Sequence, residues 1–151
     1  MSVVEELRQI RPVGSAQSLA EHYGHGRCVI CGDHNPHSLK LFFEPTEDDG
    51  VRASFTAHGT LQGYAELLHG GVSASLLDAA MTHCLFHLGI EAVTGELHIR
   101  YLHPIPCGSQ LEIRAWRLSS YPPLHCLKAQ ILSAGKIMTL AEAKFMERPV
   151  P

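Results

Sequence analysis

The chain lacks the sequence features of exported and membrane-spanning proteins. No apolar run in its 151 residues approaches the ~20 that are needed to cross a bilayer. The opening stretch MSVVEELRQIRPV contains acidic side chains and no apolar central segment, so we expect no secretory signal. Internal repeats and low-complexity linkers are absent as well. A chain of this length fits one domain with a substantial core.

Charged residues are few, and the cysteines show no disulfide pattern. Charged residues make up 18% of the chain and its net charge is -3, so we expect neither a nucleic acid nor a membrane surface as a partner. The cysteines, at positions 28, 31, 84, 107 and 126, are odd in number and scattered. Without an export signal, this pattern indicates reduced thiols and a cytoplasmic protein.

The chain does contain a series of short strand-like segments and one long apolar helix. The first 36 residues are expected to be irregular, with a short helix over Ser15–His22. Six later segments have the residue pattern and turn boundaries of strands. They are residues 39–45, 51–57, 91–104, 109–119, 124–134 and 136–146. The last four follow one another through short connections, which favours an antiparallel sheet.

The long helix is predicted from about Gly70 to Leu88, ending at Gly89. Its apolar residues leave little room for a solvent-facing side, so other elements must cover it on most sides. A curved sheet wrapped around the helix meets this requirement. We therefore predict an α+β fold in a single domain, with the irregular lead-in followed by a core over about 37–148.

The start of this helix carries an unusual combination of residues. The stretch LLHGGVSASLLDAAM, residues 67–81, opens on a histidine and two glycines and then places a lone acid, Asp78, in an apolar run. Glycine is costly inside a helix, and an unpaired carboxylate is costly in a core. The N–H groups of the glycines and the positive end of the helix dipole suit an oxyanion.

Small residues accompany Asp78 on one helical face, where they leave a groove. These residues are Gly71, Ala74, Ser75 and Thr82. The motif therefore favours a binding or catalytic site. The alternative is structural, with glycines that permit close packing and an acid that is satisfied in the core or at an interface.

Three quoted segments resemble a known family. They are LHGGVSASLLDAA (68–80), AVTGELHIRYLHPIPCG (92–108) and CVICGDHNPHSLKLFFEP (28–45). In these segments the chain resembles the hotdog-fold acyl-CoA thioesterases, particularly their phenylacetate-degradation (PaaI-like) branch. The resemblance implies the hotdog fold over a single domain, 1–151. It also implies a homodimer or homotetramer that pairs edge to edge, with active sites built from both chains at the interface.

The resemblance implies a role for each residue of the helix motif. The Gly70 N–H polarises the carbonyl of an acyl-CoA thioester, and Asp78 acts as a general base on water or as the nucleophile. His69 braces the loop and the helix start by hydrogen bonding. The other residues expected along the substrate are Gly63, Gly71, Ala74 and Ser75. Coenzyme A enters as part of the substrate, and no other cofactor is expected.

A hydroxyl that orients the attacking water in some relatives falls on Thr94, in the strand after the helix. Simple alternation turns Thr94 away from the apolar face that holds Val93 and Leu97. The assignment therefore needs a β-bulge, which we expect at Gly95.

A departure from the family pattern leaves other functions open. Relatives often carry Asn or Gln six residues before the histidine, where this chain has Gly63, preceded by Gln62. Gln62 takes that role if the loop shifts by one residue. Without the amide, a non-catalytic acyl-CoA binding or sensing protein stays an alternative. A hotdog dehydratase or hydratase is another, although the pattern HGG…D does not match a catalytic histidine in a loop.

Cysteine and histidine also occur at spacings that could serve a metal. Cys28 and Cys31 form a CxxC with His34 and His37 nearby, but four ligands so close in sequence would make a cramped site. We therefore expect no metal, and a turn of small residues that packs over the sheet.

Two histidines of the long helix, His83 and His87, are one turn apart without the glutamate of a metalloprotease pattern. We expect them at the exposed end of the helix or at an interface, and Cys84 in the core. Candidate partners for the phosphates of coenzyme A are basic residues of the later strands and turns. They are Arg100, Arg114, Arg117, Lys128 and Lys136.

Overall fold

The computed structural model describes residues 16–148. The strands are β1 (Glu44–Pro45), β2 (Val51–Thr56), β3 (Ala92–Tyr101), β4 (Gln110–Tyr121), β5 (Leu124–Ser133) and β6 (Lys136–Glu147). The helical elements are α2 (Ala16–His22), the 3₁₀ turn η1 (Gly59–Leu61) and α3 (Gly70–His87). No helix within the described range is long and apolar enough to cross a membrane.

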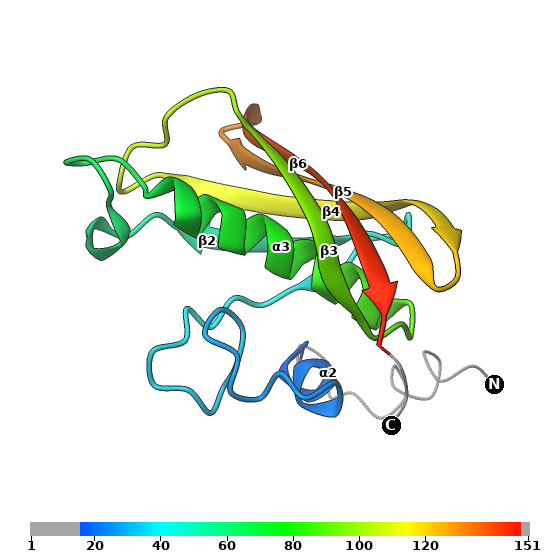
Figure 1. Ribbon diagram of the computed structural model, residues 1–151. Coiled ribbons are helices and arrows are strands. Elements are labelled where there is room, and N and C mark those ends of the chain that lie inside the picture. Colours follow the sequence, from blue (N-terminus) through cyan, green and yellow to red (C-terminus); the bar gives the residue numbers. More distant parts are fainter. Residues whose placement is uncertain (1–15, 149–151) are drawn as a thin grey trace.

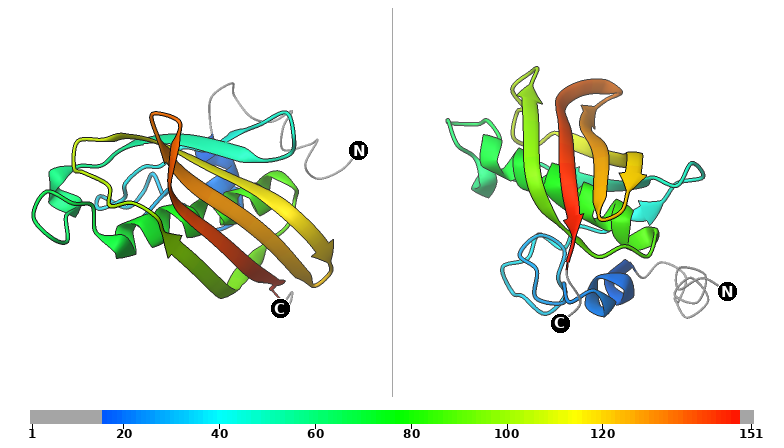
Figure 2. Two further views of the ribbon diagram at one scale, coloured as in Figure 1. Left: turned by 90° about the horizontal axis from the view of Figure 1, so that it is seen from above. Right: turned by 45° about the vertical axis from the view of Figure 1, so that its right-hand side comes forward.

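The six strands form one antiparallel sheet in the order β1-β2-β4-β5-β6-β3. The sheet twists and curves over α3, which lies along its concave face (Figures 1 and 2). Because β3 follows α3 in the chain but pairs with β6, the helix crosses beneath the sheet and the chain returns at its far edge. The prediction of an antiparallel sheet wrapped around one long helix is confirmed.

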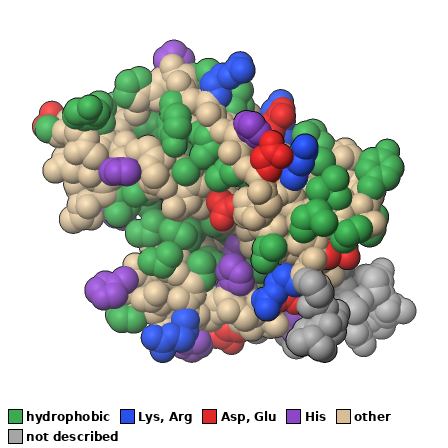
Figure 3. Space-filling view, in the orientation of Figure 1, with side chains coloured by type: hydrophobic (Ala, Val, Ile, Leu, Met, Phe, Trp, Pro, Cys, Tyr) green, Lys and Arg blue, Asp and Glu red, His purple; other side chains and the backbone are tan. Residues whose placement is uncertain are grey.

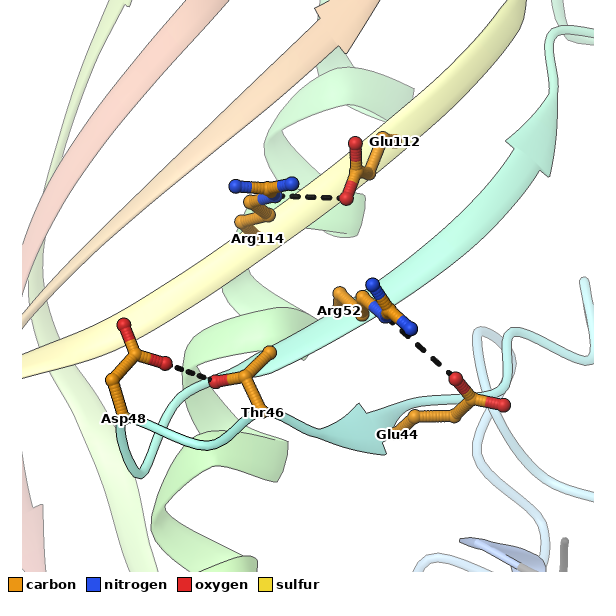
Figure 4. Close-up of polar contacts among 6 residues, drawn as sticks. All are labelled: Glu44, Thr46, Asp48, Arg52, Glu112 and Arg114. Atoms are coloured by element: carbon orange, nitrogen blue, oxygen red, sulfur yellow. Dashed lines mark hydrogen bonds and ion pairs between the residues drawn. The ribbon is translucent and has the colours of Figure 1, made fainter.

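Strand residues alternate between a buried side that faces α3 and an exposed side. β2 and β5 show this most regularly, and Ile113, Leu127 and Ile131 are among the side chains without exposed surface. Ion pairs cover the exposed side near β1, β2 and β4, where Arg52 pairs with Glu44 and Arg114 with Glu112 (Figure 4). The alternation therefore separates the core from solvent across the sheet.

The side of α3 that faces away from the sheet is covered by the lead-in, residues 16–43 (Figure 1). Tyr23 stacks on Phe86 with ring centroids 4.5 Å apart, and Phe43 stacks on His83 at 4.6 Å. The prediction that His83 and His87 line an exposed helix end is wrong, because both are buried. Cys84 lies in the core as expected.

Most predicted elements are observed within a few residues of their expected bounds, including the short helix, seen as α2. The exception is the predicted strand 39–45, of which only Glu44–Pro45 is a strand. The N–H groups of Leu39 and Leu41 donate to carbonyls of Val29 and Ile30, so this segment pairs with an earlier part of the lead-in instead of with the sheet. Leu41 and Phe43 are buried all the same, and Leu39 packs against the core, which is why the segment gave a strand-like pattern.

Leu127→Ala tests the assignment of the core. Leu127 has no exposed surface, so its truncation leaves a cavity and should lower the free energy of unfolding by about 2–5 kcal/mol. Leu118→Ala is the matched control because Leu118 is 53% exposed, and we expect a change below about 0.5 kcal/mol. Urea unfolding followed by circular dichroism measures both. Equal losses in the two variants would contradict the inward placement of Leu127.

Candidate active site

The N-terminus of α3 presents a free backbone donor. His69 is the N-cap residue, and its Nδ1 accepts a hydrogen bond of 2.8 Å from the Gly71 N–H. The Gly70 N–H, by contrast, has no acceptor in the part of the chain that the structure describes. His69 is in turn backed by Gly63, where an added Cβ would come within 3.2 Å of its ring. The arrangement fixes the helix start and leaves the Gly70 N–H available.

Tyr101, the last residue of β3, holds Gly70 from the other side. Its hydroxyl donates a 2.7 Å hydrogen bond to the Gly70 carbonyl, and its ring lies 3.5 Å from where a Gly70 side chain would begin. The sequence analysis did not identify Tyr101 as a site residue. Nothing in the local pattern shows that the end of this strand meets the helix start.

A groove of about 660 Å³ lies beside this helix start. Its walls come from the loop before α3, the first turn of α3, the end of β3 and residues 103–105. They include the predicted site residues Gly63, His69 and Gly70. The volume lies within the range of small-molecule sites, and a largely apolar lining with a few polar groups is usual for them.

Thr139 supplies one polar group to the groove. It is 1% exposed, and its Oγ1 has no hydrogen-bond partner among the described residues. A buried hydroxyl without a partner is uncommon in proteins. It is therefore a point at which a bound molecule can be recognised.

Asp78 and Thr94 meet farther along α3. The Thr94 hydroxyl donates to Asp78 Oδ1 at 2.5 Å. This contact depends on a register shift between Thr94 and Glu96, at Gly95, as the sequence analysis required. Beyond the shift Leu97 pairs with Ala143, and before it Thr94 pairs with Phe145, so both lie on the face of the sheet that turns towards α3. Thr94 itself stays exposed to solvent.

The prediction for Val93 is wrong because of the same bulge. Val93 was expected on the inward face with Leu97, but it pairs with Met146 and is 51% exposed. The extra residue at Gly95 exchanges the two faces of the strand. Thr94 gains the inward position that Val93 loses.

The two groups of residues are separated within one chain. Asp78 lies eight positions after Gly70 on the same helix, a rise of about 12 Å at 1.5 Å per residue. Neither Asp78 nor Thr94 lines the groove beside Gly70. A single chain therefore presents a donor and a carboxylate that cannot both contact one carbonyl group.

The remaining predicted residues have local partners. Gln62 Oε1 accepts from the Glu66 N–H at 2.9 Å, which closes the loop before α3. The Ser75 hydroxyl donates to the Gly71 carbonyl at 2.9 Å. Like Ala74, these residues do not line the groove. Among the basic residues named as candidates for the phosphates, Arg114 and Lys128 form ion pairs on the sheet.

The lead-in contains a second group of chemically reactive side chains. Cys28 and Cys31 lie beside His25, whereas His34 pairs with Glu21 and His37 is exposed. Hydrogen bonding with Cys31 lowers the pKa of the Cys28 thiol to about 3. The same hydrogen bond is the largest cause that raises the pKa of the Cys31 thiol, and burial is the second. None of these residues touches the groove or Asp78.

His69→Ala tests the architecture of the helix start. Loss of the cap leaves the Gly71 N–H without its acceptor, so we expect the free energy of unfolding to fall by about 0.5–2 kcal/mol. His58→Ala is the control because His58 caps η1 without a side-chain hydrogen bond, and it should change stability by less than about 0.5 kcal/mol. Chemical denaturation of both variants measures these free energies of unfolding. A stability loss no greater for His69→Ala than for the control would contradict the capping role.

The chain is similar to known thioesterases in sequence and structure. The family model of the Thioesterase superfamily matches residues 65–119, which include α3 and β3. A solved thioesterase superfamily protein is 24% identical and superposes with a TM-score of 0.77, covering 95% of this chain and 77% of its own. No curated protein matches the chain.

Two further solved structures share the fold. The PaaI protein of the Escherichia coli phenylacetic acid degradation operon is 18% identical with a TM-score of 0.67, covering 86% of this chain and 88% of its own. A Streptococcus mutans UA159 protein bound to acetyl CoA is 17% identical with a TM-score of 0.67, covering 72% and 88%. The family match and the shared fold together confirm the resemblance of this chain to the hotdog-fold thioesterase superfamily, with PaaI proteins among its structural neighbours.

Proposed function

We propose that the protein is an acyl-CoA thioesterase that hydrolyses a thioester to a free acid and coenzyme A. The observation that carries the proposal is the solvent-accessible contact between Asp78 and Thr94, on the face of β3 that turns towards α3. A helix start with a free Gly70 N–H supplies the second requirement of thioester hydrolysis. Both lie in the segment that matches the Thioesterase superfamily.

The Gly70 N–H is suited to polarise the thioester carbonyl. It lies at the positive end of the α3 dipole, and His69 and Tyr101 hold the residues around it. A fixed donor acts most strongly on the negative charge that develops on the carbonyl oxygen during attack. Removing one such donor typically costs about 3 kcal/mol of transition-state stabilisation.

Asp78 and Thr94 are suited to activate water. Because Thr94 donates its proton to Asp78 Oδ1, the Thr94 oxygen and Asp78 Oδ2 can both accept hydrogen bonds from one water. Asp78 then takes a proton as the water attacks the carbonyl carbon, and the C–S bond breaks as coenzyme A leaves with a proton. Direct attack by Asp78, through an anhydride that water hydrolyses, is the alternative chemistry for the same carboxylate.

The proposed site needs two chains. Since Gly70 and Asp78 of one α3 are about 12 Å apart along the axis, the donor and the carboxylate that act on one carbonyl come from different subunits. β3 lies at the end of the sheet and exposes Val93 and Tyr101, so its outer edge is open to pairing. We propose that a second copy pairs there, in a homodimer or homotetramer.

The ligand chemistry rests on the neighbours. The Streptococcus mutans structure with acetyl CoA supports a coenzyme A thioester as the ligand of this fold, and we extend it to this chain. The groove beside Gly70 is the proposed location of part of that ligand. Arg100, Arg117 and Lys136 stay the proposed phosphate partners. The cytoplasm stays the proposed compartment, because the cysteines are free.

Asp78→Asn tests the reaction. The amide cannot accept the proton, so we expect kcat to fall by about 10²–10⁴-fold, with the fold and the oligomer retained. Thiol release from a panel of short, medium, long-chain and aromatic acyl-CoAs provides the measurement. Glu44→Gln, which removes an exposed carboxylate at the sheet edge, is the matched control and should keep full activity.

Thr94→Val provides a second test of the same pair. Valine keeps the shape but removes the hydroxyl that contacts Asp78, so we expect kcat to fall by about tenfold while KM changes little.

Wild-type protein that binds acyl-CoA without releasing thiol would instead establish the non-catalytic binding alternative, which the missing amide at Gly63 favours. Hydration or dehydration of an enoyl-CoA without thiol release would point to the remaining alternative.

A further inference from the structure

The lead-in brings three metal-binding side chains to one point. His25 follows α2, and Cys28 and Cys31 lie in the next turn of the chain. Their ligand atoms all lie within 4.8 Å of one another, and Cys31 Sγ is 3.8 Å from His25 Nδ1. Cys31 is buried and the other two are half-buried. The spacing in the sequence suggested His34 and His37 in this place, but His25 is the residue that the fold supplies.

The backbone holds this turn in one conformation. The Gly32 N–H donates to the Cys28 carbonyl at 2.9 Å, and the Ile30 N–H points to Cys28 Sγ at 3.4 Å. A Cβ at Gly32 would lie 2.5 Å from the Cys28 nitrogen and from the Gly26 carbonyl oxygen, so only glycine fits. The two sulfur atoms are therefore directed to the same side by a tight turn.

The spacing of these atoms agrees with tetrahedral zinc. With Zn–S of about 2.3 Å and Zn–N of about 2.05 Å, tetrahedral angles separate two sulfur ligands by about 3.8 Å and a sulfur and a nitrogen by about 3.6 Å. The observed 3.8 Å between Cys31 Sγ and His25 Nδ1 differs little from that value. Thiolate and imidazole together select zinc over the hard cations that prefer oxygen.

A fourth candidate ligand lies on α3 beside His25, outside the group of three whose ligand atoms are within 4.8 Å of one another. His83 is 1% exposed, and neither of its ring nitrogens has a hydrogen-bond partner within residues 16–148. Its ring centroid lies 6.4 Å from that of His25, with Phe86 against both rings. Buried imidazole nitrogens are normally paired, and coordination to a metal beside His25 would account for the absence of a hydrogen bond.

We propose that His25, Cys28 and Cys31 bind Zn²⁺, with His83 as the fourth ligand. Four protein ligands leave no position open for water or substrate, so the site is structural. The metal joins the lead-in to the face of α3 that the sheet does not cover. It is distinct from the groove and from Asp78, and its test does not depend on thioesterase activity.

Metal content of the untagged wild-type protein is the first measurement. Protein stripped with a chelator under reducing conditions should take up one Zn²⁺ per chain. With Co²⁺ it should show thiolate-to-cobalt charge transfer and the strong visible bands of a tetrahedral site. Zinc should also raise the Tm of the stripped protein, because it binds the folded lead-in more tightly than the unfolded chain. Absence of stoichiometric zinc and of the cobalt bands in folded, reduced protein would overturn the proposal.

Variants locate the site. Cys28→Ser/Cys31→Ser should lose the zinc, whereas Cys107→Ser/Cys126→Ser, which removes two other free thiols, should keep it. His37→Ala is the control for histidine, since His37 is exposed on the same lead-in. If the cysteine variant fails to fold, the Co²⁺ spectrum of the wild-type protein still shows whether the thiolates bind the metal. Formation of a Cys28–Cys31 disulfide in preference to zinc binding would replace the proposal with a redox role.

His83→Phe tests the fourth ligand. Phenylalanine preserves the stacking on Phe43 but removes both nitrogens, so zinc affinity measured by competition with a chromogenic chelator should fall at least tenfold. An unchanged affinity would overturn the assignment of His83.

Discussion

The covering of α3 is the constraint on which the rest of the structure depends. This helix has buried residues around almost its whole circumference, so a sheet on one side alone cannot stabilise it. The curved sheet covers one part, and the aromatic residues of the lead-in cover another through Tyr23 and Phe43. Once both layers are in place, the helix is held along its length. Its first turn and the Asp78 face are the parts that stay accessible.

The chemistry of the candidate site follows from that placement. A helix fixed from both sides can present the Gly70 N–H in one orientation, because no flexible segment carries it. The bulge at Gly95 brings a hydroxyl from the neighbouring strand to the Asp78 carboxylate. Helix and strand thus contribute one group each to the contact, and both groups are positioned by the packing of the core rather than by a mobile loop.

Much of this arrangement could be predicted from the sequence, because hydrophobic periodicity is a local property. The helix and the later strands follow from residue spacing. The need for a bulge near Thr94 follows from the resemblance to the thioesterases, which assigns a role to Thr94 that simple alternation does not allow. Long-range contacts could not be predicted in this way. Leu39 and Leu41 look like strand residues because both pack against the core, but their hydrogen-bond partners are Val29 and Ile30, outside the sheet. The contacts of Tyr101 with Gly70 and of His25 with Cys31 join segments whose proximity only the fold reveals.

Tyr101 connects two features that are otherwise separate, the outer edge of the sheet and the start of α3. It is the final residue of edge strand β3, and its hydroxyl donates a hydrogen bond to the Gly70 carbonyl. Gly70 is also the residue with the free N–H. Any chain that pairs along β3 acts on the strand that orients this donor. Thermodynamic linkage makes the relation mutual, since a ligand at Gly70 that is sensitive to pairing must alter the affinity of the edge by the same factor. Assembly of the subunits and binding of the ligand would then be thermodynamically coupled.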